Sequence, residues 1–361
     1  MKNVLLALLL AGGAVLPVQA QPHDSSTASG PTVQKADWLI VPYASYTPTT
    51  KLSLGGAFGY YTTAPPGQSP SQVEVSLKVT QRRQISAEIE PELYLNDDRL
   101  HIAAELRGSK FPSSFHGVGG DTRERDEESY TSSYGVLDLT VQQRVRPHLH
   151  VGPTMFVRVG DITDPEAGGV IATNQVVGAE GGITAGLGGA ILWNTRDNDY
   201  FPTTGTYAEA EATWYSSAWW SDQTFGILKT DLRGYQSVGP GILAGQVYTE
   251  NVIGRAPFLL LPKLGGDDLM RGYRSGRFRE NVLWSVQTEY RFPLFWRFKG
   301  TAFTSAGEVA PRISPTLFED VELAAGLGAR FQLTDSGLHG RFDVAYSRTG
   351  IEFYVSVGEA F

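Results

Sequence analysis

A charged, glycine-rich segment late in the sequence carries the residues best placed to do chemistry. Residues 265–274 read GGDDLMRGYR, with Arg271 in their second half. The alternating segment 282–292 follows and carries Glu289 on its polar side. An arginine enclosed by protein needs an acidic partner, because an unpaired buried charge is very costly. If this strand belongs to a closed sheet, its polar side points inward, and we expect the segment to fold in so that Arg271 meets Glu289.

The other residues that could act on a substrate form weak patterns. Of six histidines, only His148 and His150 lie close together, and the acidic neighbours of a zinc motif are missing. No Gly-x-Ser-x-Gly nucleophile motif occurs. His116 with Asp121 and Asp126 is the one arrangement that resembles the acid–base group of a barrel hydrolase. The sequence therefore predicts a protein that is not an enzyme and that needs no cofactor or metal.

The beginning of the chain has the features of a secretory leader. Lys2 gives a positive start, residues 4–16 are apolar, and residues 18–20 (VQA) end in the small-residue pattern of a cleavage site. The apolar run is shorter than the roughly 20 residues of a membrane-spanning helix. We therefore predict a signal peptide at residues 1–20, followed by a disordered periplasmic lead-in at residues 21–35 that is rich in polar residues.

Composition excludes several classes of protein. The chain has 30 Lys and Arg against 38 Asp and Glu, a net charge of −8, whereas nucleic-acid binding needs a basic face. It contains no cysteine, so disulfides and a lipidated N-terminal cysteine are excluded. After the leader no apolar run reaches about 18 residues, which excludes a helical membrane protein. A β-barrel in a membrane stays compatible, because lumen-facing polar residues lower the hydropathy of each strand.

Residues 84–95 show the strand pattern most clearly. Ile85 and Ile89 lie on one face of a strand of period two, and Glu88, Glu90 and Glu92 lie on the other. Three carboxylates on one face suit a wet lumen, and they also suit the solvent side of a soluble sandwich. This strand alone leaves both alternatives open.

The connections between strands separate these alternatives. Residues 36–361 have room for about sixteen strands at roughly 20 residues per strand and connection, and bacterial barrels have even numbers of strands. Short and long connections alternate, and we expect each kind at its own rim. The sequence thus predicts an all-β fold, a transmembrane antiparallel β-barrel. The short connections are 47–50, 81–83, 146–148, 238–240, 292–295 and 334–337, and the long ones are 65–71, 110–128, 163–178, 216–223, 254–281 and 310–321.

The end of the chain is a strand pattern that finishes in an aromatic residue. Residues 351–357 alternate between an apolar and a polar face, and Phe361 is the last residue. A terminal aromatic on such a strand resembles the sorting signal of outer-membrane barrels, and an ordinary soluble edge strand is the alternative. Gly350, Gly358 and Phe361 also predict sparse packing where the last strand meets the first.

Met270, Arg271, Gly272 and Tyr273 form one of four motifs that together resemble a known family. They are similar to the Arg-Gly-aromatic motif of the BamA/TamA superfamily of outer-membrane assembly proteins, also called bacterial surface antigen proteins. In that family the motif lies in the long loop between strands 11 and 12, and by our count it does so here. The resemblance covers residues 36–361. The other motifs are residues 288–293 (TEYRFP), 115–121 (FHGVGGD) and 194–198 (NTRDN), the last with Pro202 and Gly205.

The resemblance implies a defined position for the motif arginine. Arg271 is expected to fold back into the barrel and to pair with Glu289 on the inner wall of strand 12. The family usually adds a second acid on strand 13, and Ser305 occupies that position here. A serine can accept a hydrogen bond but carries no charge. We therefore expect a weaker lock, or help from Glu308 or the aspartates of residues 267–268.

The resemblance also implies a role without covalent chemistry, in the assembly, insertion or translocation of proteins at the outer membrane. The assembly members of the family carry periplasmic POTRA domains, for which residues 21–35 leave no room. Expected partners are outer-membrane lipid, lipopolysaccharide, and client or periplasmic proteins, and not nucleic acid. A passive pore or structural barrel is one alternative, and a surface antigen with ligand-binding loops is another. The mixed charges of residues 123–128 suit a solvated loop, or else a contact with divalent cations or lipopolysaccharide.

Overall fold

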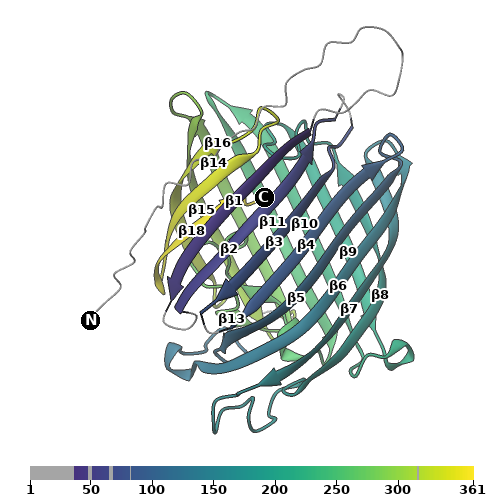
Figure 1. The fold of residues 1–361 in the computed structure, drawn as a ribbon, viewed down its shortest axis with the longest axis vertical. Coiled ribbons are helices and arrows are strands. Elements are labelled where there is room, and N and C mark those ends of the chain that lie inside the picture. The colour runs from purple at the N-terminus through teal and green to yellow at the C-terminus, as the bar shows by residue number, and fades with distance from the viewer. Residues whose placement is uncertain (1–35, 48–50, 65–67, 82, 315–316) are drawn as a thin grey trace.

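The computed structural model describes residues 36–361 except for residues 48–50, 65–67, 82 and 315–316. Sixteen strands form one antiparallel sheet, each paired with its neighbour in the chain apart from a small excursion between β11 and β14 (Figure 1). The predicted all-β fold of about sixteen antiparallel strands is confirmed. Among the described residues, no helix is long and apolar enough to cross a membrane. The predicted signal peptide and lead-in lie outside the described residues.

Strand β6, with 19 residues, is the longest of those described. A two-stranded ribbon, β12 with β13, belongs to the long connection between β11 and β14. The strands are β1 (Ala36–Thr47), β2 (Lys51–Thr62), β3 (Gln72–Thr80), β4 (Ile85–Leu95), β5 (Leu100–Phe115), β6 (Glu128–Arg146), β7 (Leu149–Thr163), β8 (Gly181–Asn194), β9 (Gly205–Tyr215), β10 (Phe225–Val238), β11 (Gly241–Gly254), β12 (Lys263–Leu264), β13 (Phe278–Arg279), β14 (Val282–Pro293), β15 (Phe298–Ala310), β16 (Glu322–Gln332), β17 (His339–Ser347) and β18 (Gly350–Val357), and the short 3-10 helices are η1 (Glu124–Asp126), η2 (Ser217–Trp219) and η3 (Phe258–Leu260).

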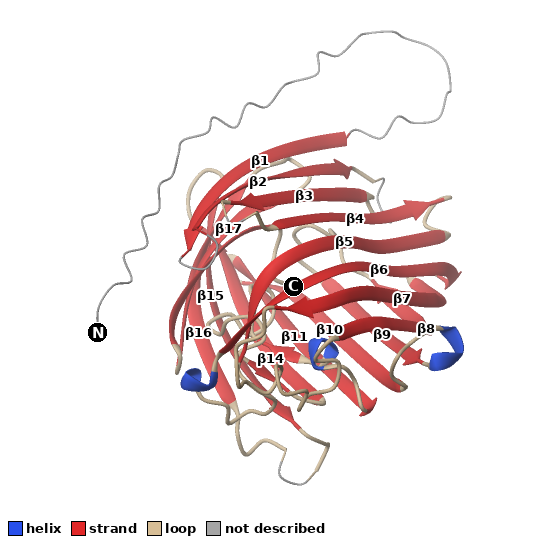
Figure 2. Cartoon of the chain, turned by 60° about the horizontal axis from the view of Figure 1, so that its bottom comes forward, coloured by secondary structure: helices blue, strands red, loops and turns tan. Residues whose placement is uncertain are grey.

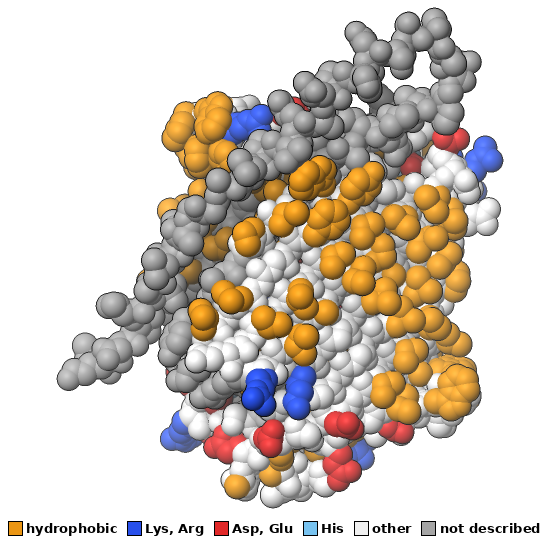
Figure 3. All heavy atoms as spheres, in the orientation of Figure 1, with side chains coloured by type: hydrophobic (Ala, Val, Ile, Leu, Met, Phe, Trp, Pro, Cys, Tyr) orange, Lys and Arg blue, Asp and Glu red, His pale blue; other side chains and the backbone are white. Residues whose placement is uncertain are grey.

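Alternation along each strand gives the sheet two different faces. On β8, Leu187 and Ile191 are exposed on the outer face, whereas Ala190 and Leu192 are buried on the inner face. Successive side chains of a strand point to opposite faces, so a period of two in the sequence produces this division. Apolar side chains spread over the outer surface between the rims (Figure 3). An exposed apolar outer face is what contact with lipid requires.

The two rims of the sheet carry different elements. One rim, here called the loop rim, holds the long connections 116–127, 164–180, 255–281 and 311–321, and the opposite, terminal rim is where β1 begins and β18 ends. The predicted separation by length fails in the first quarter of the chain. The short connections after β1 and β3 join strands at the loop rim, and the longer connection after β2 joins strands at the terminal rim. The sequence reading missed the tight turn at residues 96–99, which shifted the alternation before it by one strand.

The sheet curves (Figure 2) until its two edge strands, β1 and β18, lie on the same side of the molecule (Figure 1). Leu39 of β1 and Val357 of β18 pack against one inner cluster, formed by Tyr61, Tyr200 and Leu338. The hydrogen-bonded order runs from β1 to β18, and within the described residues it does not pair these two strands with each other. We call their junction the seam.

Candidate functional site in the barrel lumen

The connection between β11 and β14, residues 255–281, is here called the lumen loop. Glycines let its motif turn and approach the wall closely. Gly265 has a φ of 105°, and a Cβ there would lie 2.3 Å from the carbonyl oxygen of Arg274. Gly272 has a φ of 117°, and a Cβ there would lie 3.0 Å from the Cβ of Ala324 on β16. Only glycine fits both the backbone angle and the space. The motif therefore lies directly on the inner wall.

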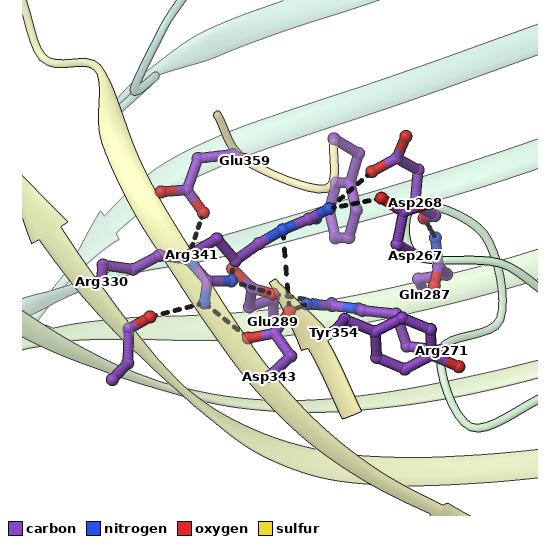
Figure 4. Close-up of polar contacts among 12 residues, drawn as sticks. Asp267, Asp268, Arg271, Gln287, Glu289, Arg330, Arg341, Asp343, Tyr354 and Glu359 are labelled. Atoms are coloured by element: carbon purple, nitrogen blue, oxygen red, sulfur yellow. Dashed lines mark hydrogen bonds and ion pairs between the residues drawn. The ribbon is translucent and has the colours of Figure 1, made fainter. Parts of the chain in front are cut away.

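Arg271 is held by two carboxylates inside the lumen (Figure 4). Its Nη2 donates to Glu289 Oε2 of β14 at 2.7 Å, and its Nη1 donates to Asp343 Oδ2 of β17 at 2.6 Å. All three side chains are almost completely buried. The face of the Phe303 ring of β15 lies against the guanidinium, with 3.6 Å between Cζ and the ring centroid. Charge-assisted hydrogen bonds of this kind are stronger than neutral ones.

Ser305, expected as the second partner of Arg271, forms no hydrogen bond with it among the described residues. Its hydroxyl has no hydrogen-bond partner among the described residues, although the residue is buried on the inner face of β15. Strand β15 contributes Phe303 to the guanidinium instead, and the second acid is Asp343, two strands further along the sheet. Glu308, named as a helper, binds the indole of Trp284.

The carboxylates of Glu289 and Asp343 hold further arginines, so the site is a network. Arg291 Nε lies 2.8 Å from Glu289 Oε1, and Arg330 Nη1 lies 2.5 Å from Asp343 Oδ1. Arg330 also pairs with Glu359, near the end of the chain, at 2.7 Å. We call the whole set the lumen cluster. Its members are Arg271, Glu289, Arg291, Arg330, Arg341, Asp343 and Glu359.

Arg341 connects the lumen cluster to the aspartates of the lumen loop. Its Nη2 lies 2.8 Å from Asp268 Oδ1 and 3.5 Å from Asp267 Oδ2, and its Nε lies 3.9 Å from Asp343. The two aspartates thus take part in holding the loop through Arg341. No ion pair joins either of them to Arg271 among the described residues.

The residues beside Arg271 fix the loop through backbone contacts. The amide N–H of Met270 donates to Gln287 Oε1 at 3.1 Å, and the N–H of Gly272 donates to the hydroxyl oxygen of Tyr354 on β18 at 2.9 Å. Tyr273 donates its hydroxyl to Glu322 of β16 at 2.6 Å. Burial, with the neighbouring Glu322 carboxylate, raises the pKa of Tyr273 to about 12. The motif therefore contacts β14, β16, β17 and β18 from inside.

A second loop covers the lumen loop at the loop rim. Arg277 donates to the hydroxyl and the carbonyl oxygen of Thr122 at 2.9 and 2.7 Å, and the N–H of Gly119 donates to the Arg279 carbonyl at 2.9 Å. The segment that resembles the family's glycine-rich loop thus docks on the lumen loop. Its β-hairpin stays paired as far as Phe115, so the connection is shorter than the predicted 110–128.

The β8–β9 connection, residues 195–204, crosses the lumen at the terminal rim. The Asn198 amide donates to the Ser336 carbonyl, at the turn between β16 and β17, at 2.9 Å. The Tyr200 hydroxyl donates to the Thr62 carbonyl, at the end of β2, at 3.3 Å. These two contacts lie on opposite sides of the seam. The connection therefore ties both sides of the seam together at this rim.

Side chains within the β8–β9 connection accept hydrogen bonds from its backbone and hold it in a turn. Asp197 Oδ1 accepts the amide N–H groups of Thr203 and Thr204 at 2.8 and 3.0 Å. Burial acts to raise the pKa of Asp197, but the hydrogen bond from the Thr203 hydroxyl, together with these two amides, outweighs it and holds the pKa below its ordinary value. Asn198 Oδ1 accepts the N–H of Tyr200 at 2.8 Å. The motif residues 194–198 thus build a turn that presents Tyr200 to the seam.

Phe361, predicted as a sorting signal on the terminal strand, lies inside the lumen. Strand β18 ends at Val357, and Phe361 packs against Tyr235 and Ala244 with only 3% of its surface exposed. The prediction that Phe361 lies on the last strand beside the seam is wrong, whereas an added Cβ at Gly350 or Gly358 would meet no atom within 4 Å, which agrees with the sparse packing predicted there. Gly358, with a φ of 87°, turns the chain off the wall instead.

The residues considered for other chemistry are not assembled into a site. Among the described residues, no hydrogen bond or ion pair joins His116 to Asp121 or Asp126. His150 Nε2 binds the Asp98 carbonyl oxygen at 2.7 Å, whereas the exposed His148 contacts the Asn194 carbonyl. His148 and His150 thus each bind a backbone carbonyl and do not form a shared substrate position.

Three lumen carboxylates come nearest to a metal-binding group. Glu88, Glu90 and Glu105 place ligand oxygens within 4.8 Å of one another. Arg107, however, forms ion pairs with both Glu88 and Glu105. The guanidinium of Arg107 already pairs with two of the three carboxylates, so the arrangement works as an ion-pair group of the inner wall.

Sequence reasoning missed Asp343, Arg330 and Glu359 as members of the site. The signal for Asp343 was present, because Arg341, Asp343 and Ser347 alternate with apolar residues and so share the inner face. Strand parity gives the face of a side chain but not which strand lies opposite a loop. Glu359 follows the last strand, where parity gives no information.

The motif loop inside a sixteen-stranded sheet points to a family. Residues 69–361 match the Omp85 superfamily domain. The chain belongs to the Omp85 superfamily. The predicted resemblance to a BamA/TamA-type barrel is thereby confirmed. As an Omp85 protein, the chain is a bacterial outer-membrane β-barrel.

Several solved structures share the fold of this Omp85 chain at low sequence identity. BamA from Haemophilus ducreyi lacking POTRA domains 1–3 is similar with a TM-score of 0.59 and 13% identity, over 90% of this chain and 70% of that chain. CdiB from Acinetobacter baumannii gives 0.55 and 11%, over 89% and 59%. CdiB from Escherichia coli gives 0.56 and 12%, over 89% and 62%, so the chain spans less than two thirds of either CdiB. No curated protein sequence matches the chain.

Proposed function

We propose that this Omp85 barrel takes part in the assembly, insertion or translocation of proteins at the outer membrane, without covalent chemistry. The observation that carries the proposal is the attachment of the lumen loop. Arg271, Gly272 and Tyr273 contact β14, β16, β17 and β18 from inside. With β15, whose Phe303 ring lies against Arg271, these strands are consecutive in the sheet and end at the seam with β18. A wall braced from within, beside an unpaired edge, supports opening of the sheet at the seam.

Edge strands give the proposal its physical mechanism. An unpaired edge presents backbone N–H and C=O groups that can pair with a strand of another chain. In lipid these groups must be satisfied, so the edge is costly unless a strand of a client protein pairs with it. β18 and β1 are the edges here. A client strand that adds to either edge passes from the lumen into the membrane with its backbone paired throughout.

The orientation of the barrel follows from its rims. Outer-membrane barrels place short turns in the periplasm and longer loops outside. On this basis the loop rim faces the exterior, and the terminal rim, with the β8–β9 connection, faces the periplasm. Tyr200 then controls the periplasmic end of the seam. Client proteins and outer-membrane lipid are the partners that this orientation requires.

A disulfide across the seam tests the proposal. Leu39→Cys with Val357→Cys is the pair to begin with, because both side chains pack on the same inner cluster. The natural chain has no cysteine, so the engineered bond is the only one that can form. The oxidised barrel is expected to lose the ability to insert an unfolded outer-membrane barrel into liposomes, and reduction should restore it.

A matched disulfide inside the wall serves as the control. Ala212 of β9 and Leu228 of β10 are register partners on the outer face, far from the seam in the strand order. Cysteines at these two positions should leave insertion unchanged in both redox states. Loss of activity in this control would mean that general stiffening matters. Unchanged activity of the oxidised seam pair would remove the proposed mechanism.

A passive pore is the alternative with a clear experimental distinction. The lumen loop and residues 195–204 cover opposite ends of the lumen through the contacts described above, which favours a barrel that conducts little. Planar-bilayer recordings should therefore give small, infrequent currents. A large steady conductance of the natural chain would favour the pore instead.

A further inference from the structure

Three cations inside the barrel near the loop rim are not balanced by an acid. Arg158 belongs to β7, Lys263 to β12 and Arg279 to β13, and we call them the loop-rim cations. Arg158 lies on the inner face of its strand, since the neighbouring Val159 is exposed on the outer face. No ion pair joins any of the three to an acid among the described residues. The nearby Arg107, by contrast, pairs with glutamates of β4 and β5.

The β12–β13 ribbon places two of these charges opposite each other. Lys263 and Arg279 are register partners in the ribbon. A Cβ on Gly276, which has a φ of 71°, would lie 2.9 Å from Arg279 Nη2 and 3.5 Å from Lys263 Cδ, so both side chains lie beside this glycine. Like charges directly opposite each other on paired strands are destabilising. The ribbon therefore concentrates positive charge that its own residues do not balance.

The two arginines have only neutral hydrogen-bond partners. Arg158 Nη2 donates to Ser132 Oγ at 3.1 Å, and its Cζ lies 4.7 Å from the centroid of the Tyr134 ring. Arg279 Nη1 donates to the Phe258 carbonyl at 3.2 Å, and its buried Nε has no partner among the described residues. Arg158 is 8% exposed and Arg279 is 4% exposed. A buried guanidinium without an anion is costly, so this position favours a ligand that brings negative charge.

Lys263 connects the two buried arginines to the space inside the sheet, where its side chain is exposed. Enclosure by the surrounding protein, with the charge of Arg279 and further that of Arg158, lowers the pKa of Lys263 to about 8. Glu250 of β11 acts in the opposite direction, but the same carboxylate also interacts with Lys229. One shared acid therefore leaves an excess of positive charge around Lys263.

We propose that Arg158, Lys263 and Arg279 form a lumen site for a phosphate group. The three donors come from three strands, and the oxygens of a tetrahedral phosphate accept hydrogen bonds in several directions, whereas a carboxylate offers two oxygens in one plane. Arginine and lysine are both common phosphate ligands in proteins. The phosphate group belongs either to free orthophosphate or to a phosphate ester. Bound there, it joins the β12–β13 ribbon to β7.

Calorimetric titration of the complete barrel in detergent tests this site. Orthophosphate, added in a buffer of low ionic strength, should bind saturably with one site per chain. Lys263→Gln and Arg158→Gln should each weaken binding at least about tenfold, because each removes a charged donor. Lys299→Gln is the matched control. Lys299 is a lumen lysine near the terminal rim, with its Nζ 3.5 Å from the centroid of the Phe201 ring, and its replacement should leave the affinity unchanged.

Glycerol 2-phosphate distinguishes the two sources of the phosphate group. Equal binding of this ester and orthophosphate would assign the site to phosphate esters, and binding of orthophosphate alone would assign it to the free ion. Both results support the site. Compact mobility on SDS gels confirms folding of each variant, and Lys263→Gln, at an exposed position, remains testable if Arg158→Gln does not fold. No saturable binding of either compound, or equal effects of Lys263→Gln and Lys299→Gln, would overturn the proposal. None of these results requires insertion activity, so this site and the proposed function fail separately.

Discussion

Replacing Asp343 with asparagine removes one negative charge from the lumen cluster and keeps the shape of the side chain. Asp343 accepts from Arg271 at 2.6 Å and from Arg330 at 2.5 Å, and it is fully buried. Removing one partner of a buried ion pair typically costs about 3–5 kcal/mol. The asparagine oxygen still accepts one bond, and Arg330 retains Glu359 and Glu289. We therefore expect the lower end, about 3 kcal/mol, for Asp343→Asn.

The shift should be visible in the temperature at which the barrel loses its compact mobility on SDS gels. For a protein of this size, 1 kcal/mol corresponds to roughly 2 °C, so a decrease of about 6 °C is expected. Ser305→Ala is the matched control. Its buried hydroxyl has no partner among the described residues, so its removal should change stability by less than about 0.5 kcal/mol.

A double-mutant cycle shows whether the effect comes from the contact with Arg271. Arg271→Ala combined with Asp343→Asn should give a coupling of about 1–3 kcal/mol, as for residues in one ion-pair network. Arg271→Ala combined with Ser305→Ala should be additive. If Asp343→Asn costs no more than Ser305→Ala, or if the first pair is additive, the assignment of Asp343 as the second acid is refuted.

Three further predictions concern other parts of the lumen. Glu289→Gln should destabilise the barrel more than Arg271→Ala, because Glu289 contacts three arginines. When Arg271 is removed, by contrast, Glu289 and Asp343 keep their other arginine partners. The thermal midpoints of the two variants decide this. Tyr200→Ala should loosen the terminal rim and raise the frequency of channel openings in planar bilayers, with Tyr200→Phe, which keeps the ring, closer to the natural chain. Burial, with the charge of Arg277 nearby, lowers the pKa of His116. As pH falls below the ordinary value of about 6.5, the unfolded state therefore binds the proton first, and stability declines. Urea unfolding at several pH values should show this decline, and His116→Asn should reduce it.

Much of the fold could be predicted from the sequence because a strand in a two-faced sheet repeats every two residues. The same rule put Glu289 on the inner face, where the structure has it beside Arg271. The rule does not depend on which strands meet, so it works without knowledge of the whole sheet. It fails at a very short turn, such as residues 96–99, because the pattern does not show that the chain reverses there. Missing this one reversal assigned every earlier connection to the wrong rim.

The rest of the site depends on the path of the lumen loop across the barrel. Asp343 has the correct parity, but its contact with Arg271 requires the loop to pass Phe303 of β15 and reach β17. No local pattern specifies that path. Glu359 and Phe361 lie beyond the last strand, where the chain turns inward at Gly358. Their position is determined by Arg291 and Arg330, which are distant in sequence.

The rate of client insertion by the Leu39→Cys and Val357→Cys barrel, before and after reduction, tests the central claim most directly. If the seam opens during function, the oxidised barrel should insert an unfolded client no faster than liposomes without protein. Reduction should then return the rate to that of the natural chain. Equal rates in the oxidised and reduced states, with the bond confirmed by mass spectrometry, would contradict opening at the seam.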